Sequence, residues 1–151
     1  MKVIQRPGRI LLTLGTRLED VFLLGWAVRG VCEGAGFRDD DLRSLELALV
    51  EAVTNVIRHA FRGEEGYAVT IEIVISPESV VFRIVDRGAA MADRAFVRCD
   101  FDPADVASLP EGGMGKSIIA AVMDDIAYEC EGGTNTLILT KKLPSRAEET
   151  P

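Results

Sequence analysis

The sequence lacks several features that would point to particular classes of protein. Its three cysteines, Cys32, Cys99 and Cys130, are an odd number without close or metal-type spacing. This pattern predicts reduced thiols rather than a disulfide framework or a metal site. No apolar run approaches the roughly 18 residues that cross a bilayer, and residues 1–7 are too short and polar for a signal peptide. We therefore expect a soluble, cytoplasmic protein that does not enter the membrane.

Basic residues are outnumbered by acidic ones. The chain has 17 Lys and Arg against 24 Asp and Glu, which gives a net charge of −7 at pH 7. This balance argues against direct nucleic-acid binding and favours protein or small-molecule partners. With 151 residues, a single domain over 1–143 can bury a core without disulfides or metal, and we expect the polar tail over 144–151 to be disordered.

The clearest periodic pattern lies over 41–61. Apolar residues recur there at steps of three and four without Gly or Pro, which predicts a core-facing α-helix, capped by an aspartate from 39–41. Glu51, Asn55 and His59 stand at i, i+4 and i+8, so they form a polar row on another face. Such a row is either a solvated stripe or a binding face. Because the rest of the helix is also apolar, partial burial and a bound ligand are expected.

The remaining patterns predict five strands and two further helices around a long connection. Two hairpins joined by helices are typical of an α+β fold, a two-layer sandwich of a mixed, mostly antiparallel sheet with helices on one face. The connection over 86–115 is long enough to be a lid. The predicted strands cover 9–14, 68–75, 80–85, 126–130 and 136–140, and the predicted helices cover 17–32 and 116–123.

Two Gly-containing segments carry candidate binding chemistry. Residues 111–117 end in Gly-Lys-Ser, but Pro110 stands where a P-loop requires glycine, so we reject a Walker A motif. The segment is either a phosphate site, in which backbone N–H groups approach the ligand, or a hinge with a helix cap. Asp86 and Gly88 follow a predicted strand and form either a simple turn or an acceptor for a ligand amino group.

Taken together and in order, these motifs resemble the N, G1, G2 and G3 boxes of the ATPase superfamily that includes gyrase, heat-shock chaperones, histidine kinases and MutL. Within that superfamily the short domain, with Glu-Ala-x-Thr-Asn in its N box, resembles the bacterial anti-sigma factor serine kinases. The resemblance covers nearly the whole chain and implies the Bergerat-type ATP-binding fold. It rests on residues 51–55 with 59–60, 86–88, 112–115 and 133–136.

The resemblance implies a site for ATP and Mg²⁺. In that site Asn55 would bind Mg²⁺ through its amide oxygen, and Glu51 would be the catalytic base that accepts the proton of a serine hydroxyl or of water. Asp86 would bind the adenine amino group. The further cofactor-binding residues that the resemblance implies are His59, Gly88, Gly113, Gly115, Lys116 and Thr136.

The resemblance also implies a function and its partners. The protein would be an ATP-dependent serine/threonine protein kinase that sequesters a sigma factor, phosphorylates a STAS-domain anti-anti-sigma protein and forms a homodimer. Two alternatives stay open: a nucleotide-binding interaction module that transfers no phosphate, and a switch kinase that does not bind sigma. The chain departs from the family pattern at residues 89–92, at Lys116, where an aliphatic residue is common, and at Asn135, which interrupts a usually β-branched strand.

Overall fold

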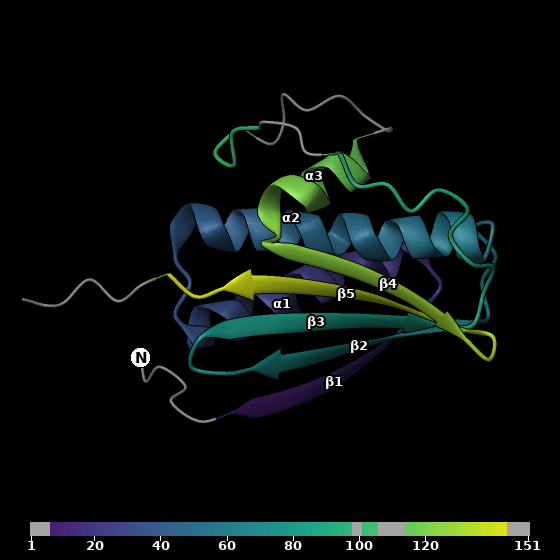
Figure 1. Cartoon of the computed structure of the whole chain (residues 1–151), viewed down its shortest axis with the longest axis horizontal. Helices are drawn as coiled ribbons and strands as arrows, with labels where there is room; N and C mark the ends of the chain where they lie inside the picture. The colour runs from purple at the N-terminus through teal and green to yellow at the C-terminus, as the bar shows by residue number, and fades with distance from the viewer. Residues whose placement is uncertain (1–6, 98–100, 106–113, 145–151) are drawn as a thin grey trace, which may run out of the picture.

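The structure, a computed structural model, describes residues 7–97, 101–105 and 114–144. It confirms the α+β fold, with a five-stranded sheet in the order β1-β2-β3-β5-β4 (Figure 1). All four pairings among the described strands are antiparallel, whereas we expected a mixed sheet. The strands are β1 (Gly8–Gly15), β2 (Ala68–Ile75), β3 (Ser79–Asp86), β4 (Asp125–Glu131) and β5 (Thr134–Lys142).

The helices lie together on one face of this sheet, with α2 crossing it behind α3 (Figure 1). They are α1 (Val21–Ala35), α2 (Asp39–Asn55) and α3 (Gly115–Val122). A 3₁₀ turn, η1 (Leu18–Asp20), precedes α1, and a π-helical turn, η2 (Val56–Ala60), continues α2. No helix within the described ranges is long and apolar enough to cross a membrane.

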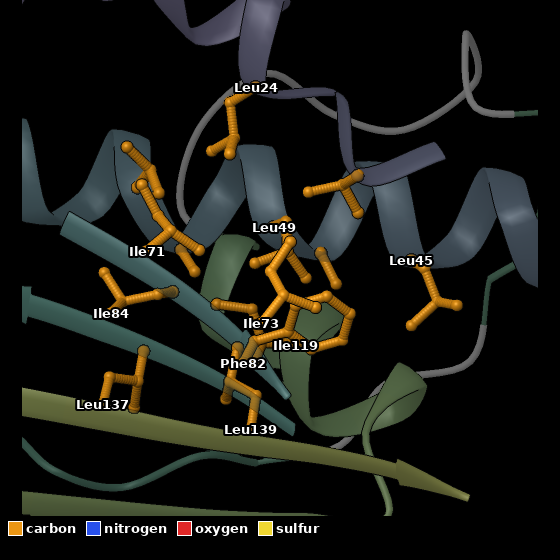
Figure 2. Close-up of a cluster of buried hydrophobic side chains, with 14 of the residues drawn as sticks. Leu24, Leu45, Leu49, Ile71, Ile73, Phe82, Ile84, Ile119, Leu137 and Leu139 are labelled. Atoms are coloured by element: carbon orange, nitrogen blue, oxygen red, sulfur yellow. The ribbon is translucent and has the colours of Figure 1, made fainter. Parts of the chain in front are cut away.

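The core fills the space between the sheet and the helices. Strands β2 and β3 alternate buried and half-buried residues, so one face of each strand points at the helices. Figure 2 shows Ile71, Ile73 and Phe82 of the sheet directed toward the helical layer, where Leu45 and Leu49 of α2 and Ile119 of α3 lie. This packing fixes α2 against the sheet and therefore fixes the polar row that α2 carries.

Helices α1 and α2 end and begin with different capping arrangements. Helix α1 ends at Gly36, whose φ of 114° is the left-handed conformation that glycine adopts without strain. The expected aspartate cap of α2 is wrong, because Arg38 occupies the cap position and makes no side-chain cap bond. Asp39, Asp40 and Asp41 instead lie in the first turn, where their charges still favour the positive end of the helix dipole.

The expected lid and tail fall partly outside the described residues. Within the connection, residues 87–97 and 101–105 contain neither helix nor strand, which agrees with an irregular segment. Of the expected tail, only Pro144 is described. Gly112 and Gly113 are also outside the described ranges, so the predicted role of Gly113 stays a prediction.

Candidate functional site

A cavity of about 420 Å³ lies between the helical layer and the irregular segment that follows β3. Its volume falls within the range of small-molecule sites. Five separate parts of the chain line it, which brings residues distant in sequence to one place. The lining residues are Ala52, Asn55, Val56, His59, Ala60, Asp86, Ala89, Ala90, Met91, Ala92, Asp93, Phe96, Lys116, Ile119, Tyr128 and Leu137.

The polar row of α2 and η2 forms one wall of this cavity. Asn55 and His59 line it, as the helical spacing predicted. Glu51 lies one turn earlier, beside the start of α3: a Cβ atom built on Gly115 would be 2.6 Å from Glu51 Oε2 and 3.2 Å from Asn55 Nδ2. Only glycine fits at Gly115 without displacing these two side chains. The close approach places Gly115 directly against the predicted base and the predicted metal ligand.

Asp86 is the last residue of strand β3 and lines the cavity. The residue is buried, with only 5% of its surface exposed. Oδ1 accepts hydrogen bonds from the Gly88 amide at 2.9 Å and from Asn135 Nδ2 at 3.0 Å. Among the described residues none donates to Oδ2, so one carboxylate oxygen remains available to a donor in the cavity.

Gly88 lies against the backbone at the end of η2. A Cβ atom on Gly88 would lie 2.5 Å from the Ala60 carbonyl oxygen, and the Ala89 amide donates to that same oxygen at 2.9 Å. The missing side chain therefore makes room for the backbone at the end of η2, and the role of Gly88 beside a ligand stays a prediction. This contact joins the turn after β3 to the helix that carries Asn55 and His59.

Lys116 extends from the first turn of α3 across the mouth of the cavity. Its ammonium donates to the Asp93 carbonyl oxygen, lies 4.0 Å from Asp93 Oδ1 and sits 5.0 Å from the centre of the Phe96 ring. These contacts connect α3 to the irregular segment on the other side. They also keep a positive charge at the rim, where an anionic group of a ligand would meet it.

The structure does not bring Thr136 to the cavity. In the β3–β5 pairing, Asp86 faces Asn135 and Val85 faces Thr136. Because paired residues share a face and successive residues alternate, Asn135 is on the face of Asp86 and Thr136 is on the other face. The sequence contained a signal for this parity: Leu137 and Leu139 are both core residues, and Asn135 is two positions before Leu137.

Tyr128 is a cavity residue that the sequence analysis missed. Its hydroxyl accepts a hydrogen bond from the Met91 amide at 2.8 Å, and the Arg94 guanidinium lies 5.0 Å from its ring centre. Burial raises the pKa of the Tyr128 hydroxyl above its ordinary value, so the phenol stays neutral at physiological pH. Tyr128 thus fixes the backbone of the Ala-rich segment that forms the cavity's outer wall.

The donor set of the cavity suits a metal that arrives with a ligand. Within the described ranges, no group of three or more His, Cys, Asp or Glu could hold a metal ion. Mg²⁺ commonly takes only one or two protein oxygens and completes its shell with phosphates and water. The Asn55 amide is therefore sufficient as a protein ligand if a nucleotide supplies the remaining oxygens.

Comparison with known proteins gives a family match and several similar relatives, of which two are described. Residues 16–141 match the family model described as Histidine kinase-like ATPase domain. The chain is 30% identical over 145 residues to the Serine-protein kinase RsbW of Listeria monocytogenes serovar 1/2a, covering 93% of this chain and 91% of that protein. It is 27% identical over 143 residues to the Serine-protein kinase RsbW of Bacillus cereus strain AH187, covering 92% of this chain and 88% of that protein.

Proposed function

The chain belongs to the histidine kinase-like ATPase family, and we propose that it is an ATP-dependent serine protein kinase that acts as an anti-sigma factor. The observation that carries the proposal is the cavity, where Asn55, Asp86 and Lys116 meet from three separate elements. The amide oxygen of Asn55 suits the metal ion, the carboxylate of Asp86 suits the adenine amino group, and the cation of Lys116 suits the phosphates of ATP. The similarity to serine-protein kinases along nearly the full length of the chain supports the same activity.

Each end of the nucleotide has a protein group of suitable chemistry. The free oxygen of Asp86 would accept the adenine amino group, while Lys116 would exchange its contact with Asp93 for a phosphate oxygen. Asn55 would hold Mg²⁺, which when bound neutralises charge on the triphosphate. His59, which lines the same wall, would contribute a hydrogen bond toward the nucleotide.

Glu51 is the proposed general base. Its carboxylate lies against Gly115 at the start of α3, one of the residues proposed to hold the phosphates. There it would accept the proton of the attacking serine hydroxyl as the new bond to phosphorus forms. A domain that only bound nucleotide would need Asn55 and Asp86 but would have no use for a carboxylate at this position.

We further propose the partners of this kinase. The substrate is a serine of a STAS-domain anti-anti-sigma protein, and the sequestered protein is a sigma factor, so the protein acts in the cytoplasm. The acidic net charge of −7 supports action through protein partners rather than direct contact with DNA.

A homodimer is the proposed assembly. Phe22, Leu23 and Trp26 of α1 are 68%, 56% and 67% exposed, so this apolar group is not core. Contiguous exposed apolar residues mark protein interfaces more often than solvated surface. Sedimentation of the wild type and of Trp26→Glu tests this: a dimer in the wild type and a folded monomer in the variant are expected, and a monomeric wild type refutes it.

Transfer of labelled γ-phosphate to a purified STAS-domain protein tests the kinase. Glu51→Gln keeps the shape of the side chain but removes the base, so transfer should fall by about 10²–10⁴-fold while ATP binding persists. The matched control is Glu46→Gln on the same helix, because Glu46 pairs with Arg29 at 3.4 Å and does not line the cavity. It should transfer phosphate at the wild-type rate.

Two other results would change the conclusion. ATP binding without transfer to any STAS-domain protein would favour the nucleotide-binding module, and failure to bind ATP would refute the proposal. Native mass spectrometry with the sigma factor tests sequestration. A kinase that transfers phosphate but forms no sigma complex would be the switch kinase.

A further inference from the structure

Asn135 occupies an unusual position for a strand residue. It lies on β5 directly opposite Asp86 and is 3% exposed. Its Nδ2 atom donates to Asp86 Oδ1 at 3.0 Å and to the Gly88 carbonyl oxygen at 2.9 Å. Asparagine is disfavoured in strands. A buried asparagine whose two amide protons both bond to the turn after β3 therefore indicates a role at that turn.

The orientation of this amide is fixed by its partners. Both neighbours of Nδ2 are acceptors, a carboxylate oxygen and a carbonyl oxygen. A flipped side chain would place the Asn135 oxygen against two other oxygens, which repel it. The amide therefore donates to Asp86 and to Gly88 at the same time and joins the carboxylate to the backbone of its own turn.

The consequence is a carboxylate with one occupied and one free oxygen. Asp86 Oδ1 already receives two donors, from the Gly88 amide and from Asn135. Rotation of the carboxylate would break both hydrogen bonds inside a nearly buried site, where unpaired polar groups are costly. Only Oδ2 can serve a ligand in the cavity.

We propose that Asn135 is a positioning residue that makes the cavity select adenine nucleotides over guanine nucleotides. The inference rests on the proposed ATP site and deepens it. Adenine offers one amino donor at position 6, which a single fixed acceptor oxygen matches. Guanine offers a carbonyl oxygen at position 6 and two neighbouring donors, at N1 and N2, which pair best with both oxygens of a carboxylate. With Oδ1 held by Asn135, that two-oxygen pairing is unavailable, and the guanine carbonyl faces a fixed acceptor.

Calorimetric titration of ATP and of GTP into variants of two adjacent residues tests the proposal. Asn135→Leu is similar in size but has no donor, so only the Gly88 amide still holds Oδ1, and Asp86 can turn and present both oxygens more readily. The ATP-to-GTP affinity ratio should fall at least tenfold, because sites built around hydrogen bonds lose discrimination when the constraint is removed. Thr136→Val is the matched control, since its side chain is on the opposite face of the same strand. Its ratio should equal that of the wild type.

The outcomes separate this inference from the proposed function. If the wild type binds neither nucleotide, the ATP site itself is refuted, and the role of Asn135 with it. If the wild type prefers ATP and Asn135→Leu keeps the same ratio, Asn135 is only a structural residue and the inference alone fails. A merely structural role would lower the affinities for ATP and GTP together and leave their ratio unchanged.

A second measurement needs no variant of Asn135 and covers the case in which Asn135→Leu does not fold. Side-chain amide protons of Asn135 should exchange with solvent much more slowly than those of Asn55, which faces the open cavity. Both amide protons of Asn135 should remain protected when ATP binds, because the adenine amino group donates to Asp86 Oδ2 and leaves Oδ1 bonded to Asn135. Equal exchange at the two asparagines, or loss of protection on adding ATP, would overturn the proposal.

Discussion

Replacing Gly88 by alanine tests the contact that joins the turn after β3 to the end of η2. The new Cβ atom would lie 2.5 Å from the Ala60 carbonyl oxygen and 2.8 Å from the Ala60 carbonyl carbon, so the backbone must move apart. Overpacking of this kind costs about 1–3 kcal/mol, and loss of the Ala89 to Ala60 hydrogen bond adds about 0.5–1.5 kcal/mol. Alanine recovers about 0.4–1 kcal/mol by restricting the unfolded chain. The net loss should be about 2–3 kcal/mol, or roughly 5–10 °C in Tm.

The same substitution at Gly30 is the matched control. Gly30 lies within α1, and a Cβ atom built on it meets nothing within 4 Å. Alanine is favoured over glycine inside a helix by about 1 kcal/mol, so Gly30→Ala should stabilise the protein. Urea unfolding followed by circular dichroism measures both variants, with equal m-values as the condition for comparing them. A Gly88→Ala protein as stable as the wild type would show that Ala60 and Gly88 are not in close contact.

Three further perturbations have expected outcomes. Gly115→Ala would place a methyl group 2.6 Å from Glu51 Oε2, so phosphate transfer should fall at least tenfold with little change in the Tm; an unchanged transfer rate would contradict the contact. Burial raises the pKa of the Cys32 thiol from 9.0 to about 12, so its contribution to stability is complete below pH 9 and is lost as pH rises toward 12. Urea unfolding between pH 9 and 11 should show that the free energy of unfolding of the wild type falls by about 1.4 kcal/mol per pH unit relative to that of Cys32→Val. A difference between the two proteins that does not change with pH would refute burial of the thiol. Lys116→Met removes a surface contact with Asp93 and should change the free energy of unfolding by less than about 1 kcal/mol. It should nevertheless weaken ATP binding and reduce the dependence of that binding on salt, which calorimetry at two salt concentrations measures. Unaltered ATP binding would exclude Lys116 from the phosphate site.

Periodic patterns in the sequence predicted the elements well. The strands over 68–75 and 80–85 and the central helix were identified because their burial follows periods of two and of about 3.6 residues, which the sequence displays directly. The polar row Glu51, Asn55 and His59 followed from the same spacing, and the structure places two of its members in the cavity wall.

Contacts between distant segments account for what the sequence did not reveal. The reason for Gly88 is the carbonyl of Ala60, which belongs to another element and depends on the π turn of η2. Whether Asn135 or Thr136 lies on the face of Asp86 depends on the register of β5 against β3, because a shift by one residue moves each side chain of β5 to the other face. A family motif identifies a short group of residues, and strand pairing decides which of them lies on the cavity side of the sheet.

The order of the strands has a consequence for how the protein is made. Strand β5 is formed by residues 134–142, yet it lies between β3 and β4 in the sheet and supplies Asn135 opposite Asp86. During synthesis, a nascent chain that has completed α2, β3 and α3 still lacks the strand that holds the Asp86 carboxylate. A truncated product ending before β5 would therefore contain most of the kinase motifs but would lack the amide that holds the Asp86 carboxylate, and under the proposed function it could not select its nucleotide.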